Sequence, residues 1–213
     1  MVTCIALAGC GEGGAAIQSV QLEAASDLSE LTGVQELHGS LSITGNALES
    51  LASLESLEHI HGDLVISRTE NLSSLSGLQN LKTVSGKITI AYNSSLKTLD
   101  GLQGLTQAGG LMICSNPSLI NLVGLDHLSH VSGSFTLWDN ESLVSVEGLQ
   151  SLAHISGRLS VTSNPALNDL DDMSSISFIG DDLRINSNTR LISLGRIGRV
   201  ESISGSLNLN GNP

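Results

Sequence analysis

The sequence contains few aromatic, basic and cysteine residues. Only 2% of its 213 residues are aromatic, comprising one Trp, one Tyr and two Phe. So few rings cannot fill the core of an ordinary globular domain, and Leu, Ile and Val must build the interior. Nine Lys and Arg stand against 21 Asp and Glu, which gives a formal net charge of −12. This balance argues against nucleic-acid binding, which needs a basic surface, and against electrostatic docking on anionic lipid.

The cysteines and carboxylates also exclude common kinds of site. Cys4 and Cys10 lie in the first ten residues, and Cys114 is alone in the remainder. One isolated thiol offers neither a disulfide framework nor a cysteine-based zinc site. A hydrolase would need paired acids within several Å, whereas Asp63 and Asp182 lie far apart in the chain. We therefore expect a protein that is not an enzyme and that uses no cofactor.

The feature present in abundance is an internal repeat. A pattern of an apolar residue, a Gly two places later, two alternating apolar residues and an Asn recurs eight times, 23 or 24 residues apart, with Asp181 replacing one Gly and Thr69 one Asn. Such a period indicates a solenoid, in which no coil buries its apolar face alone and each stacks on its neighbours. The first strand residues of the copies are Leu41, Leu64, Ile88, Leu111, Phe135, Leu159, Leu183 and Leu207.

One copy shows how each coil is expected to fold. Val131, Gly133, Phe135 and Leu137 alternate with polar residues, as in a strand with one buried face. Over residues 143–155 the apolar positions recur every three residues, which fits short extended segments and 3₁₀-like turns. We therefore predict a mainly parallel, β-helix-like solenoid of about eight coils whose strands stack about 4.8 Å apart.

Two columns of residues are expected to shape the coils. A Gly two places before the first strand residue is interpreted as the bend where a coil enters the main sheet. An Asn five places after that residue predicts a ladder, because its amide can pair turn backbone groups that would otherwise be buried unsatisfied. The glycines are Gly39, Gly62, Gly86, Gly109, Gly133, Gly157 and Gly205. The ladder asparagines are Asn46, Asn93, Asn116, Asn140, Asn164, Asn188 and Asn212.

The first ten residues are interpreted as an address rather than as part of the fold. Leu7-Ala-Gly-Cys10 resembles the lipobox of bacterial lipoprotein signal peptides, in which the leader is cut before a lipidated Cys. The resemblance implies a leader at 1–10, lipidation of Cys10 and a flexible tether at 11–16, followed by the solenoid at 17–213. No Lys or Arg precedes the apolar run, and the alternative is a frayed apolar end of a cytosolic protein. The sequence stops just after a strand, so we expect that a C-terminal cap is missing.

The pattern Ile155-x-Gly157-x-Leu159-x-Val161-x-x-Asn164-x-x-Leu167 resembles the receptor L-domain family, whose members are relatives of leucine-rich repeats. The resemblance extends over about residues 15–213. It implies a right-handed, β-helix-like solenoid with a ligand-facing sheet and no catalytic residues. The identity of the ligand does not follow, because function depends on the variable surface positions.

The scarce large side chains predict where a ligand would bind. Tyr92, Met112, Cys114 and Trp138 gather on neighbouring coils, at or beside positions that alternate with the buried ones. Rings and a Met clustered on an exposed face are typical of a binding hot spot for protein or sugar. The alternative is that Trp138 merely shields a small neighbour such as Cys114.

These observations predict a non-enzymatic binding or adhesion module of the bacterial cell envelope. We expect a monomer that is lipid-anchored at the outer membrane or cell surface and touches the membrane only through its lipid. Its partner would be an extracellular or envelope protein or polysaccharide. The alternative is a structural spacer or scaffold of the envelope without a discrete ligand.

The histidines give only a weak metal signal. His38 and His61 are expected to stack on the sheet face with Asp63 nearby, and His130 and His154 lie on adjacent coils. Zinc-class metals need convergent ligands beyond a pair of imidazoles. Solvent-facing residues are the simpler interpretation, and we assign no metal from the sequence.

Overall fold

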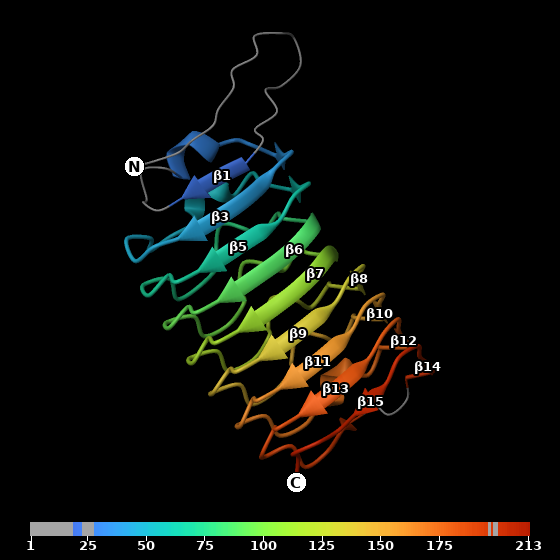
Figure 1. Cartoon of the computed structure of the whole chain (residues 1–213). Helices are drawn as coiled ribbons and strands as arrows, with labels where there is room; N and C mark the ends of the chain where they lie inside the picture. Colours follow the sequence, from blue (N-terminus) through green and yellow to red (C-terminus); the bar gives the residue numbers. More distant parts are fainter. Residues whose placement is uncertain (1–18, 23–27, 196, 198–199) are drawn as a thin grey trace.

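The protein was analysed as a computed structural model that describes residues 19–22, 28–195, 197 and 200–213. The leader predicted at 1–10, with Cys10, and the tether predicted at 11–16 lie outside these described residues. The described chain winds into one continuous stack of coils, from β1 at one end to β15 at the other (Figure 1).

All strands pair in parallel, in two ladders that run the length of the stack. The main ladder contains β1 (Ser19–Leu22), β3 (Ser40–Thr44), β5 (Leu64–Ser67), β6 (Thr83–Ala91), β7 (Gln107–Cys114), β9 (Phe135–Trp138), β11 (Leu159–Thr162), β13 (Leu183–Asn186) and β15 (Leu207–Asn208). The second ladder contains β2 (Glu36–Leu37), β4 (His59–Ile60), the first residues of β6 and β7, β8 (His130–Val131), β10 (His154–Ile155), β12 (Phe178–Ile179) and β14 (Ser202–Ile203). Three short 3₁₀ turns complete the coils: η1 (Ser29–Leu31), η2 (Ala52–Leu54) and η3 (Asp171–Met173).

The apolar positions of the repeat point inward and form a single core, except in the last coil, where Leu207 is 58% exposed. Equivalent residues of successive coils pair with each other, and Phe135, the largest buried side chain, replaces a leucine without leaving the column. On the arc, Leu128 donates its N–H to the carbonyl of Leu125, which donates to Leu122. These bonds span three residues, the 3₁₀ pattern that the apolar spacing predicts. The predicted fold class, a parallel β-solenoid of about eight turns with little helix, is confirmed.

The predicted glycine column lies at the bend between the two ladders in most coils, and it also marks a close approach between coils. A Cβ on Gly62 would lie 2.6 Å from the carbonyl carbon of Gly39, and one on Gly157 would lie 2.7 Å from that of Gly133. These glycines do not have positive φ angles. A second column, which the sequence analysis did not identify, does: Gly77, Gly101, Gly124 and Gly148 have φ of 111° to 120°. The first column therefore needs Gly because a Cβ would collide with the neighbouring coil. The second needs Gly because its backbone has positive φ.

The coil that precedes Leu111 is one residue shorter than most, and a β-bulge absorbs the difference. Val84 pairs with Ala108, whereas Lys87 pairs with Gly110, so the register shifts by one residue between these pairs. A bulge bends its strand and locally increases the twist. β6 and β7 remain continuous through the shift and link the two ladders, as the two long green strands of Figure 1 show.

Candidate functional site

A residue with left-handed backbone directly follows β3, β5, β6, β7, β9, β11 and β13, and Gly211 has the same repeat position after β15. These residues line one edge of the sheet. Their φ angles lie between 52° and 59° where the residue is not Gly. The left-handed turn directs the chain from the exposed strand into the buried Asn ladder that follows. Gly, Ser and Asp serve in most coils, but Arg68 and Tyr92 occupy the position in two neighbouring ones. A bulky side chain in this region of φ is strained, and such strain gathers at functional sites. The column is Gly45, Arg68, Tyr92, Ser115, Asp139, Ser163, Ser187 and Gly211.

The Asn ladder holds this edge in place from beneath. The side-chain oxygen of Asn140 accepts the N–H of Asn116 (3.2 Å), and its amide donates to the carbonyls of Ile113 and Trp138, both at 3.2 Å. The same pattern links the asparagines at 93, 116, 140, 164, 188 and 212, and Thr69 takes the Asn place at the start. Asn46 differs from its predicted role, because its side chain is exposed and lies outside these bonds. The ladder begins one coil too late to enclose it.

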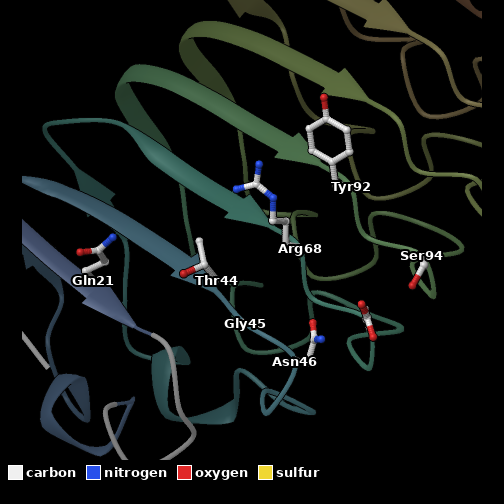
Figure 2. Close-up of a pocket in the computed structure, with 8 residues that line it drawn as sticks. Gln21, Thr44, Gly45, Asn46, Arg68, Tyr92 and Ser94 are labelled. Atoms are coloured by element: carbon white, nitrogen blue, oxygen red, sulfur yellow. The ribbon is translucent and has the colours of Figure 1, made fainter. Parts of the chain in front are cut away.

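A hollow lies beside the first three of these left-handed residues, at the ends of β3, β5 and β6. It has a volume of about 760 Å³, and Arg68 and Tyr92 stand beside each other over it at the ends of β5 and β6 (Figure 2). The guanidinium carbon of Arg68 lies 5.6 Å from the centre of the Tyr92 ring, within cation–π range. The Tyr92 ring remains 51% exposed. The lining residues are Gln21, Thr44, Gly45, Asn46, Arg68, Glu70, Tyr92 and Ser94.

Of the four residues predicted to bind a ligand, only Tyr92 lines this hollow. Trp138 is 41% exposed on β9, two strands along the ladder, and Met112 is partly buried between them on β7. Cys114 is buried, although it occupies a position predicted to be exposed. It stands directly opposite Trp138 in the ladder, where a small side chain beside an indole loses most of its contact with water.

The environment of Cys114 also disfavours a role as a reactive thiol. Burial raises its pKa, because the low-dielectric surroundings disfavour the thiolate. A thiol that stays protonated at neutral pH is a poor nucleophile and a poor metal ligand. Cys114 is therefore a small buried side chain at the end of β7, and the interpretation in which Trp138 shields it fits its burial.

The histidine pairs fall into two geometries. The rings of His38 and His61 are stacked, with centroids 4.7 Å apart and planes 5° from parallel. Those of His130 and His154 are 6.1 Å apart and tilted by 48°. Asp63, the residue expected near the first pair, instead accepts the backbone N–H of Lys87 through its Oδ1 at 2.7 Å.

Sequence reasoning missed Arg68, Glu70 and the rest of the hollow. It considered the positions that alternate along each strand, whereas most residues that line the hollow follow the strands, with only Gln21 and Thr44 lying within β1 and β3. A signal was present, since Arg68 and Tyr92 share a repeat position with Gly, Ser and Asp. Recognising it required knowing that the position is left-handed, which the period does not reveal.

Comparison with known proteins gives one match. Residues 35–124 match the family model described as Receptor L domain, and this segment contains Arg68, Tyr92 and most of the hollow. Neither the curated proteins nor the solved structures yielded a significant match. Within the described part of the chain, no helix is both long and apolar enough to cross a membrane. Residues 35–124 are therefore similar to the receptor L domain, and the parallel β-solenoid of the described residues is consistent with that fold.

Proposed function

We propose that this protein is a non-enzymatic binding module that recognises a carbohydrate in the hollow at the ends of β3, β5 and β6. The receptor L domain is a ligand-binding type of domain, which supports a binding role. The observation that carries the proposal is the placement of Arg68 and Tyr92 at strained left-handed positions, side by side and exposed. A chain that needed only to fold would use Gly, Ser or Asp there, as its other coils do.

The lining of the hollow favours a sugar over an apolar protein epitope. Amide, hydroxyl, carboxylate and guanidinium groups surround a single aromatic ring. A sugar presents hydroxyl groups to polar partners and an apolar C–H face to a ring such as Tyr92. Protein hot spots instead bring several large apolar anchors into one desolvated pocket. Trp138, two strands away, would extend the contact along the sheet edge for an oligosaccharide or polysaccharide.

The same lining supports binding rather than hydrolysis. Glu70 is the only carboxylate among the residues described around the hollow. Glycoside hydrolysis ordinarily needs two carboxyl groups flanking the scissile bond, one as acid and one as base or nucleophile. Asp139, the next acid along the edge, accepts a hydrogen bond from the Ser115 hydroxyl at 2.8 Å. One isolated carboxylate in the lining suits recognition of a ligand rather than proton transfer to it.

The proposal includes a place at the bacterial cell envelope, through lipidation of Cys10. Its support is the lipobox resemblance of residues 7–10. Expression of the full chain in a bacterial host with a radiolabelled fatty acid tests it. Label in the wild-type protein and its loss in Cys10→Ser are expected. A wild-type protein that keeps its first nine residues and takes up no label would overturn the anchor.

The binding proposal is tested with Tyr92→Asn. Asn adopts left-handed backbone readily, so the variant should fold at least as well as the wild type while losing the ring. Binding to a panel of envelope polysaccharides is measured by calorimetry and by the fluorescence of Trp138, the only Trp. We expect the affinity for the best-bound polysaccharide to fall by at least about tenfold, equivalent to about 1.4 kcal/mol.

Ser163→Asn is the matched control, since Ser163 has the same left-handed backbone three coils further along. It should leave both stability and affinity unchanged. Equal affinity of wild type and Tyr92→Asn would contradict the proposed site. If the wild type bound no polysaccharide in the panel, the carbohydrate proposal would fail and the structural spacer would become the better account.

A further inference from the structure

The register of β2 and β4 brings three metal-ligating side chains together on the second ladder. The hollow lies in the same first coils, but at the far ends of the main-ladder strands. Glu36 pairs with His59 and Leu37 with Ile60, and the N–H of His61 donates to the carbonyl of Leu37 at 2.8 Å. This bond carries the register one step further, so His38 and His61 stand side by side. Their stacked rings, 4.7 Å apart, follow from the spacing of parallel strands.

Glu36 completes the group because it lies two residues before His38. Residues two apart on a strand share a face, so the carboxylate and both imidazoles project to the same side. The Oε2 atom of Glu36 is 3.7 Å from Nε2 of His61. The ligand atoms of Glu36, His38 and His61 all lie within 4.8 Å of one another, and all three residues are exposed. Among the described residues, no side-chain hydrogen bond commits any of the three to another partner.

We propose that Glu36, His38 and His61 form a binding site for a divalent transition metal of the zinc class. Two imidazole nitrogens and one carboxylate oxygen are a ligand set that Zn²⁺ prefers, and the fourth tetrahedral position is open to water or an external ligand. Ligand bonds of about 2.0–2.1 Å require the donor atoms to approach to about 3.3 Å. Rotation of these exposed side chains provides that movement, while the two strands keep their Cα atoms fixed.

The contrast with the other histidines shows what is specific to this group. His130 and His154 also pair across parallel strands, but their rings are tilted and more widely spaced. His59 stands directly opposite Glu36 on β4, but its Nδ1 is hydrogen-bonded to the hydroxyl of Thr83 at 2.8 Å. The net charge of −12 also raises the local concentration of divalent cations around the whole surface. A specific site must therefore be distinguished from this general attraction.

The test is a titration of the full chain with Zn²⁺ and with Co²⁺, in a Cys4→Ser, Cys10→Ser background that removes the N-terminal thiols. Calorimetry should give one saturable equivalent of Zn²⁺. Co²⁺ should give the visible absorption of a tetrahedral complex, which diffuse counter-ions do not produce. NMR should show the imidazole signals of His38 and His61 shifting, while those of His130 and His154 remain in place.

His61→Ala and Glu36→Gln should each weaken Zn²⁺ binding by at least about tenfold. His154→Ala is the matched control, because it removes an imidazole from the other cross-strand pair and should change nothing. All of these residues are at least partly exposed, so the variants should fold normally. The proposal is overturned by the absence of a saturable equivalent, or by equal Zn²⁺ affinity in wild type and His61→Ala.

Discussion

At the scale of single residues, the fold depends on side chains that pair the backbone of other coils. Where each coil of this solenoid turns away from the sheet, backbone groups are buried. An N–H or C=O left unpaired there costs as much free energy as a lost hydrogen bond. Asn is suited to this place because its amide both donates and accepts. Each buried ladder Asn bonds to the coil before it and to the coil after it, as Asn116 does through Ile90 and Asn140.

Asn140→Ala tests this account of the ladder. The change leaves the N–H of Asn116 and the carbonyl of Ile113 without their partner, in a place with no access to water. We expect the free energy of unfolding to fall by about 1–3 kcal/mol. Urea unfolding followed by circular dichroism measures it. Asn46→Ala is the control, and a similar loss in both variants would show that the ladder bonds are not the cause.

At the scale of the strand, the spacing between coils depends on glycines that approach the backbone of the neighbouring coil too closely to carry a side chain. In β7 two glycines follow each other at the bulge, and their surroundings differ. A Cβ on Gly109 would lie 2.0 Å from the carbonyl oxygen of Ser85, which belongs to the backbone and cannot move aside. A Cβ on Gly110 would have its nearest neighbour at 3.5 Å, an ordinary contact.

This pair predicts opposite effects of one substitution at adjacent positions. Gly109→Ala should destabilise the protein by about 1–3 kcal/mol, because the strands must separate to admit the methyl group. Gly110→Ala should stabilise it by about 0.4–1 kcal/mol, because Ala restricts the unfolded chain and meets no obstacle. Unfolding midpoints in urea give both values. Equal effects in the two variants would mean that the bulge relaxes and that contact with Ser85 does not set the spacing.

At the scale of the whole molecule, the repeat period predicted the architecture but not the hollow proposed to bind a ligand. The period placed Leu41, Leu64 and Ile88 in one inward column, and the structure pairs them in that register. The pattern that predicts the fold recurs in eight coils. A single exception, such as Thr69 in the Asn ladder, therefore does not change the predicted fold. The hollow is different, because it arises from Arg68 and Tyr92, two departures from the pattern whose backbone conformation leaves no periodic trace. Cys114 was wrongly predicted to be exposed for a related reason. Its burial depends on the large side chain of its neighbour Trp138 and not on its place in the repeat.

The contacts of one carboxylate, Asp182, make the stability of the protein depend on pH. Asp182 joins three coils: its Oδ1 accepts the N–H of Ser206 at 2.9 Å, and its Oδ2 meets Arg184 at 2.8 Å and Arg158 at 3.1 Å. The Ser206 hydrogen bond, followed by the two guanidinium groups, lowers the pKa of Asp182 below its ordinary value of 3.8. Because the unfolded chain takes up this proton at a higher pH than the folded chain, the stabilising contribution is fully present above the ordinary pKa. It is lost as the pH falls through the lowered one.

Asp182→Asn should therefore be less stable than wild type near neutral pH, and the difference should shrink toward zero as the pH falls through the lowered pKa of Asp182. Asn keeps the shape of the side chain and can still accept the Ser206 N–H, so the difference reports the charge. Urea unfolding of both proteins across an acid pH series measures it. Glu201→Gln, which removes an exposed carboxylate with no ion pair among the described residues, controls for net charge. If Asp182→Asn and Glu201→Gln depend on pH alike, the stabilisation comes from the general charge of the chain and not from the contacts of Asp182 with the neighbouring coils.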